Sequence, residues 1–273
     1  SYAVELLMAE EKAIAVEKAK PVNDFTTQRQ QYDRSIRDEI LERIEADPNL
    51  ANRYTTVLFD ENWHKGVIGI VASRVMEHYF RPTILFTESN GMAVGSGRSV
   101  PGFNMYLALE ACSDLLHQFG GHVAAAGMSV QLDQVNAFAE RFEQVVRKQI
   151  DPSLLVPCVN YDVPLSLKAI DWKLYNSLQR FAPFGPGNLE PVFMTSGVYL
   201  YSLPRVVGNN HLKLQITEES GAAVFDAIGF NLGSHHESLE LEKPFAICYQ
   251  VEANTFNGRT SLQLNLKDLK HES

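Results

Sequence analysis

The apolar positions of the first fifty residues repeat at helical spacing. Two stripes of this kind run through residues 4–19 and 26–46. Their members are Leu6, Leu7, Ile14 and Val16 in the first, and Tyr32, Ile36, Ile40, Leu41 and Ile44 in the second. Such spacing predicts two helices that each have one apolar face. We expect Pro21 to interrupt or kink the path between them and Pro48 to end the second.

From residue 53 to residue 150 the pattern alternates between strand and helix. The expected strands cover residues 53–60, 83–87, 92–99 and 127–132, and the expected helices cover residues 65–80, 104–119 and 135–150. Strands that alternate with helices over about a hundred residues favour an α/β domain.

The second half of the chain is dominated by strand patterns. A short helix is expected within residues 166–181, followed by strands at 192–202, 211–217, 222–230, 244–253 and 260–267. Asn257-Gly258 is a strong hairpin signal, because both central positions of a type I′ turn need positive φ. Five strands fit an OB-like β-barrel, although the same number of strands also fits other kinds of β-barrel. We therefore divide the chain into residues 1–50, 51–152 and 153–273.

Composition narrows the function classes. Of the residues 45% are hydrophobic and 21% charged, and no run of eighteen apolar residues or secretory signal is present, so we expect a cytoplasmic protein without membrane partners. The net charge of −9 argues against nonspecific coating of nucleic acid. Any nucleic-acid site must be locally concentrated. Cys112, Cys158 and Cys248 are expected to be reduced thiols of the core.

The segment "GSGRS" ends an expected strand and holds a candidate anion site. Gly97 lets a backbone approach a phosphate, Ser96 can donate a hydrogen bond, and the guanidinium of Arg98 suits phosphate oxygens. The pattern alone slightly favours another interpretation, a tight turn with a solvated arginine.

The segment "GGHVAAAG" combines bare backbone with an imidazole. Gly120 and Gly121 would expose amide groups, and His122 could donate to a phosphate or transfer a proton. By itself the pattern favours a glycine C-cap followed by a loop histidine. The dinucleotide fingerprint G-x-G-x-x-G is absent.

Other polar groups are weaker candidates. Asp60, Glu61 and His64 lack the ligand set of a catalytic metal, and we expect Trp63 and His64 to order the loop before a helix. His235 and His236 are expected at the surface.

Cations and aromatic side chains of the barrel could contact a single strand. The cations are Arg205, His211, Lys213 and Arg259, and the aromatic residues are Tyr199, Tyr201, Phe225 and Phe256. Aromatic side chains supply stacking faces for bases, but half of those on any strand belong to the core.

Six segments in this order resemble one family. They are "WHKGVIGIVASR", "GSGRSVPGFNMYLALEACSDLL", "FGGHVAAAGMSV", "PFGPGNLEPVF", "HLKLQI" and "SLQLNLKDL". Together they look like the second half of the RecJ single-strand-specific exonucleases of the DHH phosphoesterase superfamily. The glycine-glycine-histidine motif occurs more widely in that superfamily, whereas the barrel and the "PFGPGN" loop point to RecJ.

The resemblance implies a fold and an activity. It implies a long connecting helix, a DHH-associated substrate-binding α/β domain and an OB domain. The catalytic DHH domain, whose aspartates and histidines hold two Mn²⁺ or Mg²⁺ ions, has no counterpart in these residues. We therefore expect the substrate-binding portion of a 5′-to-3′ single-stranded-DNA exonuclease of DNA repair and recombination, without metal or hydrolytic activity by itself. The implied partners are single-stranded DNA, the missing DHH domain and a single-strand-binding protein.

The resemblance also suggests roles for residues. Gly120, Gly121 and His122 match the motif that faces the metal site and holds the scissile phosphate. Ser96 and Arg98 match a pocket that grips a 5′ phosphate. Arg29 lies where the family has an arginine near the DNA path, although the flanking "DFTTQ" departs from the usual pattern. The assignment of the four barrel cations as DNA contacts rests on their chemistry alone, not on the resemblance.

Two alternatives stay open. One is a stand-alone module that binds single-stranded nucleic acid. The other is a phosphoesterase for short oligonucleotides or cyclic dinucleotides, against which the long barrel-bearing tail argues.

Overall fold

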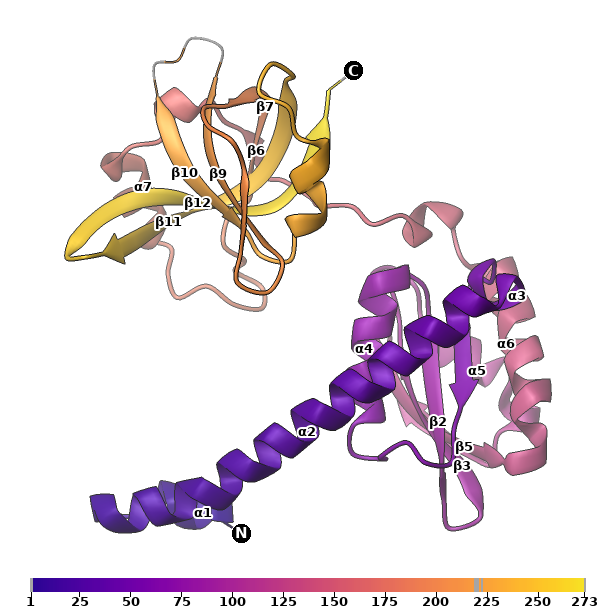
Figure 1. Ribbon diagram of the computed structural model, residues 1–273. Coiled ribbons are helices and arrows are strands. Elements are labelled where there is room, and N and C mark those ends of the chain that lie inside the picture. The colour runs from indigo at the N-terminus through magenta and orange to yellow at the C-terminus, as the bar shows by residue number, and fades with distance from the viewer. Residues whose placement is uncertain (1, 219–220, 222, 273) are drawn as a thin grey trace. The chain divides into compact units, whose positions relative to one another are not determined.

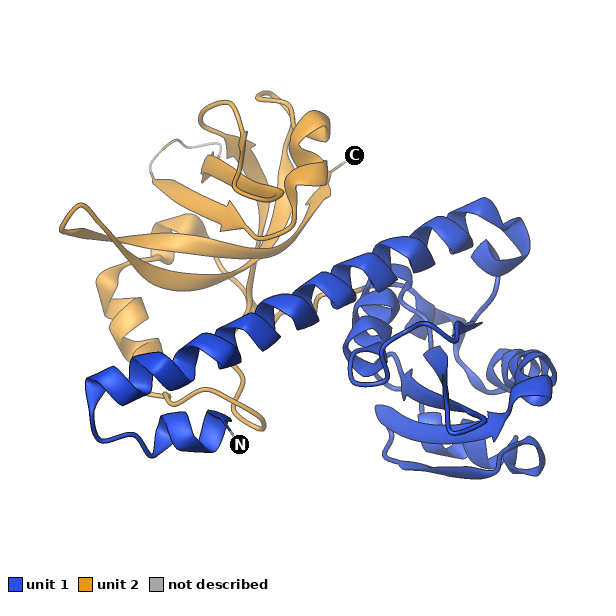
Figure 2. Ribbon diagram, turned by 60° about the horizontal axis from the view of Figure 1, so that its bottom comes forward, with its two compact units in different colours: residues 1–157 blue, residues 158–273 orange. Residues whose placement is uncertain are grey.

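The computed structural model describes residues 2–218, 221 and 223–272. It divides into two compact units, residues 1–157 and residues 158–273 (Figure 2). Within the described residues, no helix combines the length and the apolar character that a membrane span requires.

The first unit begins with helices. They are α1 (Tyr2–Leu7), α2 (Lys12–Ala46) and α3 (Pro48–Ala51). The prediction of a break at Pro21 is wrong, since α2 runs through this residue without interruption (Figure 1). Proline removes one intrahelical hydrogen bond and strains one turn, and the long helix tolerates this loss on a partly exposed stretch. The prediction at Pro48 is confirmed, because α2 ends at Ala46.

A five-stranded sheet forms the centre of the first unit. Its strands are β1 (Thr56–Phe59), β2 (Thr83–Ser89), β3 (Met92–Arg98), β4 (Gln118–Gly121) and β5 (Ala125–Gln131), in the spatial order β1-β2-β3-β5-β4. The β1–β2 pair is parallel and the other pairs are antiparallel.

Helices cover both faces of this sheet. They are α4 (Ile68–Tyr79), α5 (Met105–Glu110) and α6 (Val135–Gln149) (Figure 1). Leu85 packs with α2 and α4, whereas Ile84 and Phe86 pack with α5 and α6. Because neighbouring residues of a strand point to opposite faces, α4 lies on one side of the sheet and α5 and α6 lie on the other.

The predicted helix over residues 104–119 is wrong in its second half. Helix α5 ends at Glu110, a 3-10 turn follows at Ser113–Leu115, and the chain then enters β4. Glycines are poor helix formers, and β4 instead pairs with β5, where Phe119 lies opposite Met128.

The second unit is a β-barrel. Its strands are β6 (Val163–Pro164), β7 (Phe193–Leu200), β8 (Arg205–Val207), β9 (His211–Glu218), β10 (Val224–Gly229), β11 (Phe245–Phe256) and β12 (Arg259–His271). The pairings β7–β11–β12–β10–β9–β7 close a ring of five strands, while β6 and β8 add to it at the edges. This ring confirms the predicted barrel. Residue 222, placed in the predicted third strand, lies outside the described residues.

Short helices and one hairpin complete the second unit. The α-helix is α7 (Trp172–Gln179), and 3-10 turns occur at Leu167–Ala169 and Gly233–Ser238; another lies in the first unit at Pro152–Leu155. Asn257 and Gly258 join β11 to β12 with φ of 49° and 76°, which confirms the predicted turn.

The cysteines differ in their surroundings. Cys112 is buried, and burial raises the pKa of its thiol to about 11. Cys248 is partly buried. Cys158 is exposed, so the prediction of a core thiol is wrong there. It lies in a stretch without regular structure just after the first unit ends.

Candidate functional site

Strand β5 brings the two glycine-containing motifs together. Gly127 of β5 lies opposite Ser96 of β3 on one side and opposite Gly120 of β4 on the other. Ala126 joins Gly97 and Gly121 in the same way. Segments more than twenty residues apart in the sequence thus form adjacent strands. The glycine C-cap interpretation is wrong, because Gly120 and Gly121 belong to a strand.

The sheet requires glycine at some of its glycine positions but not at others. At Gly121, φ is +151° and an added Cβ would lie 2.4 Å from the carbonyl oxygen of Ala125, so only glycine fits. At Gly120 and Gly127, an added Cβ would meet nothing within 4 Å. The packing of the chain therefore does not require these two glycines, and they leave bare backbone facing open space.

The bare backbone forms the floor of a hollow of about 450 Å³. Its lining residues are Lys65, Val94, Gly95, Gln118, Phe119, Gly120, Gly127, Met128 and Ser129. Val94, Ser129 and Gln118 form one cross-strand row, two residues along from the row of Ser96, Gly127 and Gly120.

The two adjacent glycines of β4 provide a matched test. Gly121→Ala should lower the free energy of unfolding by about 2–4 kcal/mol, because the new methyl group clashes with backbone atoms. Gly120→Ala should change it by less than about 1 kcal/mol, since the site is open. Urea unfolding of both variants measures the difference. Equal losses of stability would contradict the assigned geometry.

Arg98 is held by neighbouring polar groups. Its Nε donates to Ser73 Oγ of α4 at 3.0 Å, and its Nη1 donates to Ser96 Oγ at 2.9 Å and to the Gly97 carbonyl at 2.7 Å. Burial lowers the pKa of Arg98 below its ordinary value, but an arginine keeps its charge near neutral pH. The interpretation as a solvated arginine is therefore wrong.

The Nη2 atom of Arg98 faces the first turn of α4. A Cβ added at Gly69 would lie 3.0 Å from this atom and 3.0 Å from Ser96 Oγ. Among the backbone bonds of the described chain, the Gly69 N–H has no carbonyl acceptor. A helix N-terminus, a guanidinium and a hydroxyl thus meet at one place, and this combination suits an anion.

Sequence reasoning missed Gly69 and Ser73. They are four residues apart and therefore share one face of α4. The sequence offers that spacing as a signal, but it does not reveal which strand the face would cover.

His122 lies in the turn between β4 and β5. Its backbone N–H donates to the Ala125 carbonyl at 2.8 Å. Two further bonds fix the turn: Ser99 N–H donates to the Ala124 carbonyl, and Met105 N–H donates to the Val123 carbonyl, both at 2.9 Å. The His122 side chain is exposed. A fixed backbone thus presents an accessible imidazole at the end of the bare strand.

Comparison with known proteins identifies both units. Residues 51–148 match the family model of the DHHA1 domain, and residues 161–268 match that of the RecJ OB domain. The chain is similar to the single-stranded-DNA-specific exonuclease RecJ of Bacillus subtilis, with 30% identity over 269 residues that cover 97% of this chain and 34% of that protein. RecJ of Escherichia coli is 34% identical over 217 residues, which cover 78% of this chain and 37% of that protein.

The chain belongs to the RecJ family. The crystal structure of Thermus thermophilus RecJ in complex with Mn²⁺ superposes with a TM-score of 0.79 and 26% identity, over all of this chain and 38% of that one. A second structure of that protein contains Mg²⁺. The chain spans about a third to a half of the length of the curated relatives it matches. The resemblance and the predicted fold class, a DHH-associated α/β domain with a long helix and an OB-like barrel, are confirmed.

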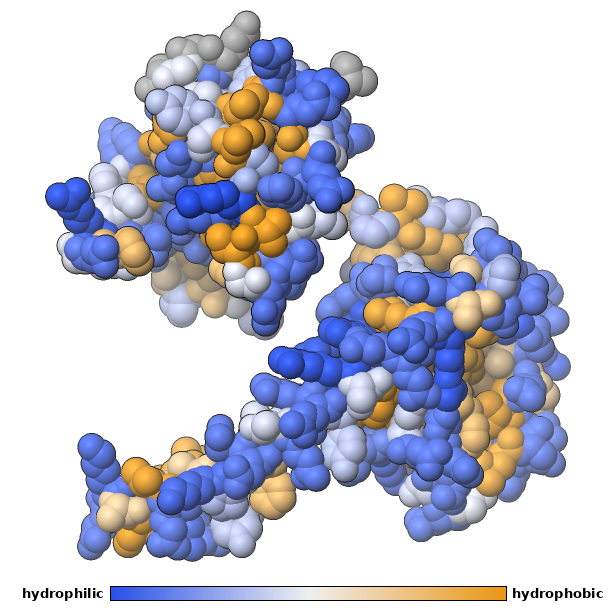
Figure 3. All heavy atoms as spheres, in the orientation of Figure 1, coloured by the Kyte–Doolittle hydropathy of each residue, from blue (hydrophilic) through white to orange (hydrophobic). Residues whose placement is uncertain are grey.

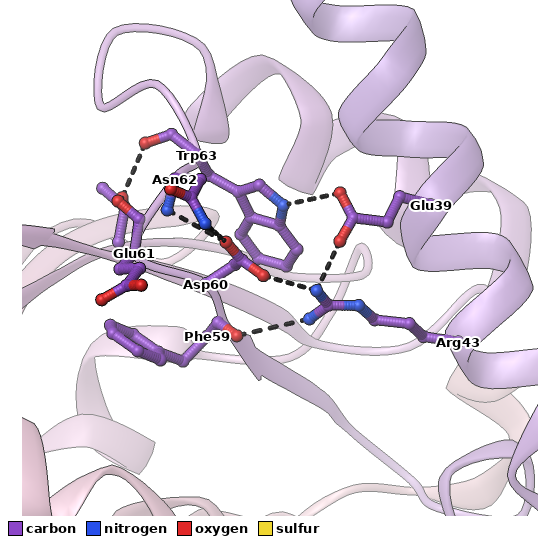
Figure 4. Close-up of polar contacts among 8 residues, drawn as sticks. Glu39, Arg43, Phe59, Asp60, Glu61, Asn62 and Trp63 are labelled. Carbon is purple, nitrogen blue, oxygen red and sulfur yellow. Dashed lines mark hydrogen bonds and ion pairs between the residues drawn. The ribbon is translucent and has the colours of Figure 1, made fainter.

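In this RecJ-family chain a polar network fixes the loop before α4 (Figure 4). Arg43 of α2 binds both Glu39 and Asp60, and Trp63 Nε1 donates to Glu39 at 3.2 Å. Burial acts to raise the pKa of Asp60, but hydrogen bonds from Asn62 and Arg43 outweigh it and leave that pKa below its ordinary value.

His64 completes the order of this loop. Its Nδ1 accepts from the Gly66 N–H at 3.1 Å, and its ring stacks on Tyr32 with 5.5 Å between centroids. The predicted ordering role of Trp63 and His64 is thus confirmed. In the part of the chain that the structure describes, no three His, Cys, Asp or Glu side chains are arranged to hold a metal ion. The residues present therefore do not fit the metal site of a RecJ enzyme.

Arg29 has different surroundings from Arg98. It lies half-buried on α2 and lines a shallow hollow with Tyr2 and Phe25. Apolar side chains gather at this end of the helices, where Leu7 and Met8 are also exposed (Figure 3). No hydrogen bond within the described residues joins Arg29 to the Arg98 cluster.

The barrel of the RecJ-family chain gathers three of its four candidate cations. Arg205 of β8 lies opposite Lys213 of β9, and His211 lies two residues along on the same face of β9. Arg259 begins β12, six residues before Asn265. Asn265 lies opposite Ile228 of β10, and Ile228 in turn lies opposite Lys213 of β9. At roughly 3.3 Å per residue, Arg259 is about 20 Å from that row.

The aromatic candidates and the other histidines are divided between surface and core. Tyr201 and Phe256 are exposed, Tyr199 is half-buried, and Phe225 packs against the barrel core. His235 and His236 are half-buried, so the prediction of two surface histidines is only partly right; His236 Nε2 lies 3.2 Å from the Pro204 carbonyl.

Proposed function

We propose that this chain is the substrate-binding portion of a RecJ-like exonuclease that degrades single-stranded DNA from the 5′ end in repair and recombination. The single observation that carries the proposal is that the Arg98 guanidinium and the Ser96 hydroxyl meet at Gly69, in the first turn of α4, beside the bare backbone of Gly120 and Gly127. Cutting would require the Mn²⁺ or Mg²⁺ ions of a DHH domain; among the described residues, no three His, Cys, Asp or Glu side chains gather as a metal site would need.

Each part of the site would have one task. Arg98, Ser96 and Gly69 would bind the 5′-terminal phosphate, since charge-assisted hydrogen bonds to phosphate are strong. The bare strand β4 would let the nucleotide approach the sheet closely. His122 would donate to the next phosphate, where the bond is cut. Arg205, His211 and Lys213 of the barrel would contact the strand farther along.

Removal of the Arg98 guanidinium tests the proposal. We expect Arg98→Ala to weaken binding of a 5′-phosphorylated single strand about tenfold or more, because one or two charge-assisted hydrogen bonds are lost. Binding of the same strand with a 5′ hydroxyl should change little. Fluorescence anisotropy measures both affinities, and Arg141→Ala serves as a control, since Arg141 is an exposed residue of α6 across the sheet. Equal losses with both strands would contradict the phosphate pocket.

A further inference from the structure

Lys65 is a charged residue that neither motif includes. It precedes α4 in the loop that Trp63 and His64 order, and it lines the hollow beside Gly120 and Gly127. Of the described residues that line this hollow, it is the one with a charged side chain. Its Nζ is 3.4 Å from Ser89 Oγ, a long and exposed contact. The ammonium group can therefore leave this partner at little cost.

The hydrogen bonds of Arg98 leave the proposed pocket short of donors. Of the five N–H groups of a guanidinium, three are used by Ser73, Ser96 and the Gly97 carbonyl. Only Nη2 remains for a ligand, so Arg98 cannot offer the two-nitrogen fork that usually binds phosphate.

A 5′-terminal phosphate needs more positive charge than an internal one. The terminal group carries a charge of about −1.5 to −2 near pH 7, whereas each internal phosphate carries one negative charge. One half-buried guanidinium with two free hydrogens does not match that charge. A pocket that selects the terminal group therefore requires a second cation.

Lys65 is in place to be this cation. It is four residues before Gly69, in the turn that leads into α4, where the Val67 and Ile68 N–H groups both donate to the His64 carbonyl. The flexible four-carbon stem of lysine can reach across such a turn. Gly69 is where the Arg98 Nη2 and the Ser96 hydroxyl meet. We propose that Lys65 is a specificity-determining residue which swings from Ser89 onto the 5′-terminal phosphate and supplies the second positive charge; this inference rests on the proposed function.

The experiment compares two single strands that differ only in the 5′ phosphate. Lys65→Met should reduce the ratio of their affinities about tenfold, the effect of one charge-assisted hydrogen bond. The reduction should come mainly from weaker binding of the phosphorylated strand. Lys65→Arg should retain most of the ratio. Lys148→Met, an exposed lysine in the last turn of α6, should leave the ratio unchanged.

The outcomes separate this inference from the proposed function. If the wild-type chain prefers the phosphorylated strand and Lys65→Met keeps the full preference, the role of Lys65 is overturned and the pocket stands. If Lys65→Met weakens the binding of both strands equally, Lys65 contacts the DNA backbone without selecting the 5′ phosphate, and the inference is also overturned. If the wild-type chain shows no preference, the pocket and the role of Lys65 both fail.

Discussion

Glu143→Ala is expected to lower the free energy of unfolding of the α/β unit by about 3 kcal/mol or more. The Glu143 carboxylate is buried and accepts hydrogen bonds from Thr55 Oγ1 at 2.6 Å, the Tyr54 N–H at 3.0 Å and Arg147 Nε at 2.5 Å. Truncation leaves the buried Thr55 hydroxyl and the Tyr54 N–H without an acceptor. Chemical denaturation of the 273-residue chain measures the loss.

A neighbouring residue on the same helix is the control. Glu140 pairs with Arg53 at the surface, and its side chain is 60% exposed. Exposed ion pairs contribute about 0–1 kcal/mol, so Glu140→Ala should have a small effect. Similar losses for Glu140→Ala and Glu143→Ala would contradict the assigned role of the buried network.

The same carboxylate makes stability depend on pH. Burial acts to raise the pKa of Glu143, but the hydrogen bonds from Thr55 and Tyr54 and the charge of Arg147 outweigh it, and the pKa lies below its ordinary value. A lowered pKa in the folded state stabilises the protein above the pKa of the unfolded chain, and this contribution is lost as pH falls through the folded value. The difference in free energy of unfolding between the wild-type chain and Glu143→Ala should therefore shrink as the pH falls into the acid range.

If the proposed function holds, His122→Ala should reduce turnover about a hundredfold in a protein that joins this chain to a metal-binding DHH domain. Loss of one oriented donor to developing charge typically costs a factor of this order. The turn that carries His122 is fixed by backbone bonds from Ser99 and Met105, so the fold should persist. Turnover of a single-stranded substrate measures the effect. His117→Ala, which changes an exposed histidine just before β4, is the control. Unchanged turnover would return His122 to a loop residue without a catalytic role.

The sequence predicted those elements whose apolar positions follow a clear period. Strand β9 is an example, because Leu212, Leu214 and Ile216 alternate with polar residues and point into the barrel. Strand β4 escaped prediction, since four residues with two glycines carry no period, and it exists only through pairing with β5.

The site was predictable in its parts but not in its assembly. Both glycine motifs were visible as possible phosphate contacts, but their convergence depends on the register of β5, which is a property of the folded sheet. The contacts of Arg98 with Ser73 and of Ser96 with the Gly69 region likewise depend on how α4 packs against β3. In the barrel, residue chemistry alone grouped Arg259 with Lys213, whereas the strand register separates them.

The most direct test of the proposed function is the affinity of the 273-residue chain for three labelled ligands: single-stranded DNA with a 5′ phosphate, the same strand with a 5′ hydroxyl, and duplex DNA. Anisotropy measures these affinities over a salt series. Binding should be salt-sensitive, because phosphate contacts release counterions, and the chain should prefer single strands over duplex and the 5′ phosphate over the hydroxyl. Absence of binding at low salt, or equal affinity for all three ligands, would contradict the proposed function.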